Sequence, residues 1–129
     1  CGMHVNGTGD VSRTSLVNQK IAGIKDTEEF LHQLPQFDHD ISSLIEAADK
    51  KGKVIRYVGS VDVASGQLQA GIKEYDRDHP FANIRGSDNV ISIQTGIYGT
   101  DCPLVIQGPG AGADVTAQGI LIDVLQLLE

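Results

Sequence analysis

Residues 103–125 read PLVIQGPGAGADVTAQGILIDVL and carry three patterns in succession. Apolar residues at 104–106 predict a short strand, the glycine-rich run at 108–114 predicts a turn, and the apolar residues that follow predict a helix over about 114–128. A strand and a helix joined in this way normally pack as layers around one core. We therefore expect a protein of mixed α and β class.

The glycine turn has two physical interpretations. Gly110 and Gly112 have no side chains to block the backbone N–H groups at the start of the helix, so an anion such as a phosphate would have access to them. The spacing Gly108-x-Gly110-x-x-Ala113 also fits the dinucleotide fingerprint, but a complete nucleotide-binding unit needs a further strand and an acidic residue about 20 positions on, and neither follows here. Alternatively, the glycines permit positive φ in a tight turn, and the Asp114 carboxylate caps the helix.

The last helix is apolar around nearly its whole circumference. Its apolar residues are Val115, Ile120, Leu121, Ile122, Val124, Leu125, Leu127 and Leu128. A helix that is apolar on all sides is normally buried on all sides. We expect its cover to be a partner chain or a portion of a larger protein of which this chain is a fragment, and a plain dimer interface would fit the same pattern.

Helical and strand periodicities also occur upstream of this stretch. Asp26 or Thr27 is expected to cap a helix over about 27–34, which ends before Pro35, and Asp38 is expected to cap a second helix. From Lys53 the period changes to two, which predicts an antiparallel hairpin of strands near 53–63 and 68–72 with both faces largely buried, followed by strands near 90–97 and 104–106. The fold class is then α+β: a mostly antiparallel sheet, two N-terminal helices, and a C-terminal apolar helix after a glycine-rich loop.

The composition excludes several classes of protein. The 129 residues include 10 Lys plus Arg and 17 Asp plus Glu, a formal net charge of −7, with the basic residues scattered singly, so no nucleic-acid partner is expected. The apolar run of the last helix is shorter than the roughly 20 residues that span a bilayer, so no membrane partner is expected. Cys1 and Cys102 form no disulfide framework, which favours a cytoplasmic location, and the four histidines have no zinc-ligand spacing, so no metal is expected.

Four blocks of sequence are distinctive enough to compare with a known family. They are FLHQLPQFDHD at 30–40, GKVIRYVGSVDV at 52–63, HPFANIRGSDNVISI at 79–93, and the stretch at 103–125. In this order they resemble the C-terminal part of homoserine dehydrogenase, most closely the enzymes of eukaryotes and the bifunctional aspartokinase–homoserine dehydrogenases. The resemblance covers about residues 26–128, and residues 1–25 are interpreted as a lead-in loop that departs from the family.

The resemblance implies an oxidoreductase that uses NADP or NAD to interconvert aspartate semialdehyde and homoserine in amino-acid biosynthesis. Residues 26–107 would supply a dimerisation and substrate-domain sheet, giving a homodimer. Residues 108–129 would return to an absent nucleotide-binding domain, with Gly112 as the expected backbone contact to the cofactor and Gly110 and Ala111 second. The family signature Gly-x-Asp-x-x-x-Lys is not intact, since Asp10 fits its Asp only by chance and Thr14 stands where Lys is expected.

No catalytic residue is therefore assigned to this chain, and we expect it to be inactive alone. Two other segments are candidate sites. His79 lies between carboxylates and Pro80, which suits either acid–base chemistry or, as we favour, a solvated loop histidine. The segment 85–89 would either position a substrate or cap the turn into the next strand. The alternative function is a non-catalytic module, derived from the same family, for self-association or protein binding.

Overall fold

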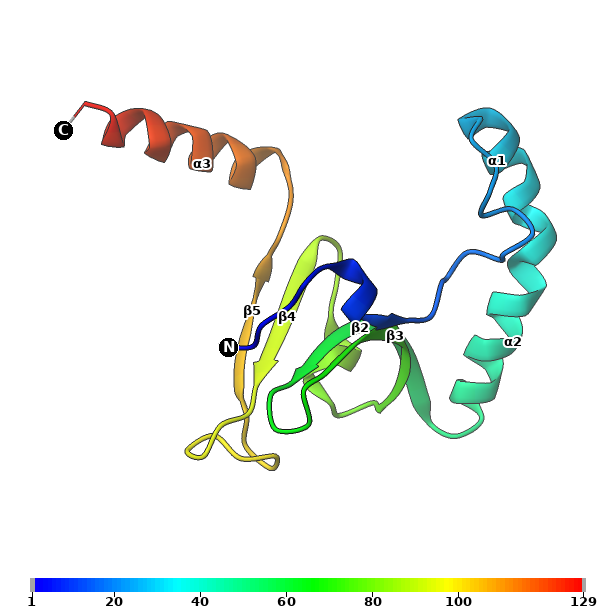
Figure 1. Ribbon diagram of the computed structural model, residues 1–129, viewed down its shortest axis with the longest axis horizontal. Coiled ribbons are helices and arrows are strands. Elements are labelled where there is room, and N and C mark those ends of the chain that lie inside the picture. The colour runs from blue at the N-terminus through cyan, green and yellow to red at the C-terminus, as the bar shows by residue number, and fades with distance from the viewer. Residues whose placement is uncertain (1, 129) are drawn as a thin grey trace. The chain divides into compact units, whose positions relative to one another are not determined.

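The structure is a computed structural model that describes residues 2–128. The chain forms two compact units, one ending at Arg77 and the other beginning at Asp78. Helices and mostly antiparallel strands share the chain, and a helix follows the glycine-rich loop near its end, so the expected α+β class is confirmed (Figure 1). The sequence-based division into residues 1–25, 26–107 and 108–129 is a different one, because it describes what each part would pack against. That division stays a prediction.

The first unit begins its regular structure with two helices joined directly. In α1 (Thr27–Gln33), the Asp26 carboxylate accepts the N–H of Glu29 at 2.8 Å, as a helix cap should. Pro35 does not interrupt the helical path, because a 3-10 turn at Leu34–Phe37 connects α1 to α2 (Asp38–Asp49) (Figure 1). Asp38 is the first residue of α2 and not its cap as expected, since its backbone N–H is already accepted by the Pro35 carbonyl within that turn.

The sheet of the first unit is built on the predicted hairpin. Strands β2 (Lys53–Asp62) and β3 (Gln67–Asp76) pair antiparallel along their whole length, from Lys53 opposite Asp76 to Asp62 opposite Gln67. A third strand, β1 (Ser12–Arg13), lies parallel to β3 at its free edge. Sequence reasoning treated residues 1–25 as loop and missed β1, as well as a 3-10 turn at Thr8–Asp10, because a strand of two residues has no periodicity to detect.

One face of this hairpin is apolar and exposed. The pairing register places its apolar residues on one side, and we call this surface the Tyr57 face: Ile55, Tyr57, Val61, Leu68, Ala70 and Ile72. Tyr57 is 47% exposed and Val61 is 53% exposed, so the expectation that both faces of β2 are largely buried is wrong for the described chain. Among residues 2–128, the buried apolar side chains are only Ile21, 4% exposed, and Ala48, 1% exposed.

The second unit consists of a 3-10 turn (Pro80–Asn83), a strand pair and the last helix. Strands β4 (Asp88–Ile93) and β5 (Leu104–Pro109) pair antiparallel from Asp88 opposite Pro109 to Ile93 opposite Leu104. β4 is shorter than predicted because the chain turns at Thr95, whose N–H donates to the Tyr98 carbonyl at 2.7 Å. Helix α3 (Ala113–Gln126) follows β5 (Figure 1). Every residue of α3 is exposed.

A candidate cofactor-facing loop

The loop between β5 and α3 contains the three predicted cofactor contacts, Gly110, Ala111 and Gly112. At its start, the N–H of Gly110 donates to the Ser87 carbonyl at 2.9 Å, which extends the β4–β5 ladder by one residue beyond Pro109. The chain then runs through Gly112, with φ 137° and ψ 156°, a conformation that L-residues rarely adopt, and becomes helical at Ala113. The three residues are consecutive and exposed, and beyond the Gly110 N–H, which Ser87 accepts, the backbone of Ala111 and Gly112 is accessible to a ligand.

The start of α3 differs from the sequence-based expectation. Gly112, not Asp114, is the cap residue, and no side chain accepts a hydrogen bond from the first N–H groups of the helix. Asp114 is instead the second residue of α3, where it adds a negative charge to the first turn. The reason is that the chain becomes helical at Ala113, two residues earlier than a cap at Asp114 would give. The expectation that the Asp114 carboxylate occupies the cap position is therefore wrong, and those N–H groups remain available.

Glycine is required at two positions of the loop for different reasons. At Gly112, a Cβ atom would meet no atom within 4 Å, so the requirement comes from the backbone conformation alone. At Gly110 the backbone conformation is an ordinary one, but a Cβ atom would lie 2.5 Å from Cγ of Asn89 and closer still to Nδ2. The loop is thus open to an approaching group at Gly112 and closed by a protein side chain at Gly110.

Asp10 and Thr14, the remnant of the catalytic signature, have local structural roles. The Asp10 carboxylate accepts the backbone N–H of Asn6 at 2.8 Å across the 3-10 turn. Thr14 continues the pairing of β1, because its N–H donates to the Ala70 carbonyl at 2.9 Å and its own carbonyl accepts the Tyr57 hydroxyl at 3.1 Å. The interpretation that the resemblance at this point is coincidental stays a prediction.

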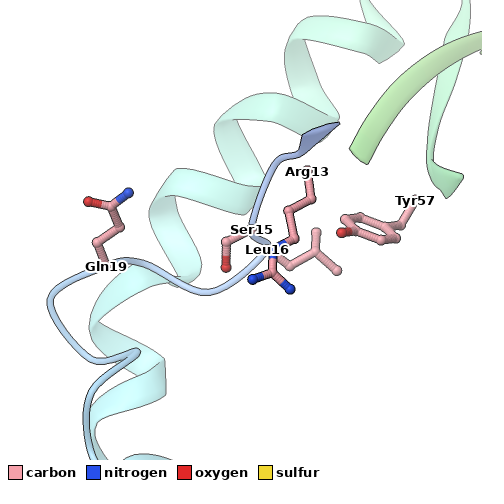
Figure 2. Close-up of a pocket in the computed structure, with 5 residues that line it drawn as sticks. All are labelled: Arg13, Ser15, Leu16, Gln19 and Tyr57. Carbon is pink, nitrogen blue, oxygen red and sulfur yellow. The ribbon is translucent and has the colours of Figure 1, made fainter. Parts of the chain in front are cut away.

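A separate hollow of about 610 Å³ lies in the first unit, on the Tyr57 face. Figure 2 shows its five lining residues, in which the Tyr57 ring extends toward Leu16 while Gln19 lies at the opposite end; the others are Arg13 and Ser15. It contains one cation, an apolar wall and two polar side chains, but no carboxylate or lysine among its lining residues. The Tyr57 hydroxyl, the general-acid group among these five residues, already donates to the Thr14 carbonyl at 3.1 Å, so the lining residues supply no acid–base pair for chemistry at a carbonyl.

The remaining candidates are structural. His79 is half-buried, and its Nδ1 accepts the N–H of Phe81 at 3.1 Å at the start of a 3-10 turn. The segment 85–89 makes the turn into β4, closed by the N–H of Asp88 donating to the Arg85 carbonyl at 3.0 Å. Asn89 was not singled out as a site residue, because its importance depends on a strand register that the sequence does not reveal.

Charged groups and helices elsewhere add no second site. Hydrogen bonds from the Ser65 hydroxyl and N–H lower the pKa of Asp62, and burial raises the pKa of Tyr75, both on the β2–β3 hairpin. Within residues 2–128, no three His, Cys, Asp or Glu side chains are grouped to hold a metal ion. Of the helices in that part of the chain, none has the length and apolar character needed to cross a membrane.

The architecture defines a layered α+β segment with an open glycine loop at the start of an apolar helix. The profile of the family described as homoserine dehydrogenase matches residues 4–125. The homoserine dehydrogenase of Saccharomyces cerevisiae is 43% identical over 128 residues, 99% of this chain and 35% of that protein, and the enzyme of Emericella nidulans is 48% identical over 101 residues, 78% of this chain and 27% of that protein. The chain belongs to the homoserine dehydrogenase family.

A solved structure agrees with this assignment. A Candida auris protein of unknown function has a crystal structure that superposes with a TM-score of 0.80 and 44% identity over 95% of this chain and 34% of that one. The chain thus spans about a third of the length of these relatives, or less. The family match begins at residue 4, so the expectation that the first 25 residues depart from the family is wrong. Those residues lack the repeating pattern on which sequence reasoning depends.

Proposed function

We propose that this chain supplies a dimerisation sheet and a cofactor-facing loop to a homoserine dehydrogenase, which interconverts aspartate semialdehyde and homoserine with NADP or NAD. The observation that carries the proposal is the open backbone at Ala111 and Gly112, placed at the start of a helix that is exposed and apolar around nearly its whole circumference. Members of this family are NAD(P)-dependent oxidoreductases, and this chain has only about a third of their length or less. The catalytic groups and most of the cofactor site would come from the remaining portion.

The loop has the properties needed to approach a nicotinamide cofactor. Its backbone N–H groups are not capped by side chains, and the space above Gly112 is open. Asp114 places a negative charge in the first turn of α3, which disfavours a phosphate and favours an uncharged part of the dinucleotide. The cofactor would supply the hydride. The residues of this chain would bind and orient the cofactor through backbone groups of Ala111 and Gly112.

The dimerisation part of the proposal is supported by the Tyr57 face. This surface is apolar and half-exposed over two long strands, as expected of a sheet face that packs against a second copy. Burying this surface would remove several large side chains from water. Each Å² of apolar area buried would stabilise the dimer by about 25 cal/mol. The cytoplasmic location and the absence of nucleic-acid and membrane partners stay predictions.

The test is a hybrid enzyme in which the whole chain replaces the matching segment of the Saccharomyces cerevisiae enzyme. We expect this hybrid to oxidise NADPH when aspartate semialdehyde is added, and the isolated chain to show no such activity. Gly112→Val should raise the KM for NADPH in the hybrid, because a β-branched residue cannot adopt φ 137°. Activity of the isolated chain, or an unchanged KM in the Gly112→Val hybrid, would contradict the proposal.

The second candidate is a module for self-association without catalysis, and the exposure of the Tyr57 face favours it equally. This candidate predicts that the isolated chain forms stable dimers that do not bind the rest of the Saccharomyces cerevisiae enzyme. Sedimentation of the chain with and without that portion, supplied as a separate polypeptide, separates the two candidates. Formation of a mixed complex supports the enzyme segment, and dimers indifferent to the added portion support the module.

A further inference from the structure

Asn89 and Gly110 come close because of the register of β4 and β5. Asn89 lies opposite Gly108, and the Ser87–Gly110 hydrogen bond places Gly110 two residues further along the partner strand, on the same side of the pair. The Asn89 side chain therefore leans diagonally over Gly110. Its amide occupies the space in which a Cβ atom of any other residue would lie.

This contact is made at the point where the ladder ends and the loop begins. After Gly110, no further β4 residue pairs with the chain before α3 starts, within the residues that the structure describes. The backbone hydrogen bond from Gly110 to Ser87 and the Asn89 side chain thus hold the same residue from two directions. Any shift of Gly110 moves Ala111 and Gly112 with it, since they are the next residues in the chain.

The geometry points to Asn89 as a positioning residue: its side chain, packed on Gly110, sets where Gly112 presents its backbone to the cofactor. This inference rests on the proposed function of the loop. The contact depends on the shape of the side chain, because Asn89 is held against a Cα atom that offers it no polar partner. Leucine has nearly the same branched shape as asparagine without its polar atoms, so shape and chemistry can be separated by substitution.

The hybrid enzyme allows a direct test with four variants. We expect Asn89→Ala to raise the KM for NADPH about fivefold while the KM for aspartate semialdehyde is unchanged. Asn89→Leu should stay within about twofold of the parent. Gly110→Ala should raise the KM for NADPH by creating a clash, and the double variant Asn89→Ala/Gly110→Ala should recover part of the loss because the added methyl group then has room. Asn83→Ala truncates another exposed asparagine of the same unit and serves as the matched control.

Equal losses in Asn89→Ala and Asn89→Leu would overturn the inference, because they would show that the amide itself contacts the cofactor. Unchanged kinetics in both variants, or a double variant worse than the sum of the single ones, would also overturn it. A parent hybrid that is folded but inactive would instead contradict the proposed function. The inference is then tested on the isolated chain by NMR. The amide signals of Ala111 and Gly112 should shift in Asn89→Ala and not in Asn89→Leu. Identical shifts in the two variants would overturn the inference.

Discussion

Gly110 and Gly112 lie two residues apart in one loop, yet glycine is needed at each for a different physical reason. Gly112 has φ 137° and open space around it, whereas Gly110 has an ordinary backbone conformation and a side chain packed against it. The first constraint belongs to the residue itself, and the second belongs to the pair that Gly110 forms with Asn89. Substitutions at the two positions should therefore respond differently to a second change nearby.

At Gly112, substitution by alanine should destabilise the loop by about 1–3 kcal/mol, the usual cost of holding an L-residue in a conformation reserved for glycine. The thermal unfolding midpoint of the hybrid enzyme measures this cost. Removing the Asn89 side chain should leave the effect of Gly112→Ala unchanged, because no atom lies within 4 Å of the added methyl group. A loss at Gly112 that Asn89→Ala relieves would show that the constraint is steric after all.

Asp26 determines where α1 begins. Its carboxylate accepts the Glu29 N–H at 2.8 Å, and no other side chain is recorded on the first N–H groups of this helix within the described chain. Asp26→Ala should lower the free energy of unfolding of the hybrid enzyme by about 1 kcal/mol. Chemical denaturation measures the change, with Thr27→Ala as the control at the neighbouring exposed position. Equal effects of the two substitutions would argue against a cap.

Among the elements, the β2–β3 hairpin has the most complete local design. Its turn is closed by Asp62, which accepts the N–H of Ala64 at 3.0 Å and the Ser65 hydroxyl at 2.6 Å. The exposed ion pairs near its open end, such as Lys53 with Asp76 at 3.1 Å, contribute little because water screens them. The register of the hairpin therefore depends on the turn and on cross-strand side-chain packing.

The pKa of Asp62 gives this turn a pH dependence with a defined sign. Hydrogen bonds from Ser65 lower the pKa in the folded state, so the stabilisation is fully present above the unfolded pKa of about 3.9 and is lost as the pH falls through the folded value. Asp62→Asn should lower the unfolding midpoint of the hybrid at about pH 6, and the difference from the parent should shrink toward about pH 3. Asp101→Asn in an exposed loop is the control. If the difference in unfolding midpoint between the parent and Asp62→Asn grew as the pH fell, the Asp62 pKa would be raised by folding and not lowered.

Sequence patterns located most of these elements because their signals are local. The cap at Asp26, the hairpin between Lys53 and Asp76, and the strand, glycine turn and helix at the end of the chain each depend on neighbouring residues. Features that depend on distant partners were missed. β1 is recognisable only from its pairing with β3, and the contact of Asn89 with Gly110 only from the register of β4 and β5.

The cap of α3 illustrates a different limit. Asp114 is a good capping residue by type, so sequence reasoning began the helix there. The structure begins it at Ala113, because Gly112 has φ 137°, a non-helical conformation that an L-residue would avoid, and so takes the cap position. Glycine permits many conformations, and composition alone does not say which one is used. The sequence and the resemblance predict Gly110, Ala111 and Gly112 as cofactor contacts, which stays a prediction, but they do not predict the exposed helix start.

For the molecule as a whole, the main observation is how little apolar surface is buried. A folded chain of this length normally buries well over half of the surface that it exposes when unfolded. Here large apolar side chains of the Tyr57 face, of β4 and β5, and of α3 are exposed, and Ile21 and Ala48 are the buried apolar residues among those described. Apolar surfaces of this extent are normally covered by other protein. The family assignment offers two sources of cover, a second copy and the remaining portion of the enzyme.

Helix α3 allows the second source to be tested. Leu121 and Leu125 are one turn apart, on the same side of the helix, and are 57% and 54% exposed. Replacing both with lysine should leave the fold of the isolated chain intact, because neither side chain is buried in it. In the hybrid, the same double variant should abolish NADPH oxidation. Each substitution loses about 1.5–3 kcal/mol of stabilisation from burying a leucine side chain. It also adds the cost of removing a charged group from water. Gln126→Lys adds a charge at a polar position of α3 that is not on the side of Leu121 and Leu125, and it should be tolerated. Full activity in the double variant would mean that α3 stays exposed in the enzyme, and its apolar surface would then need another partner.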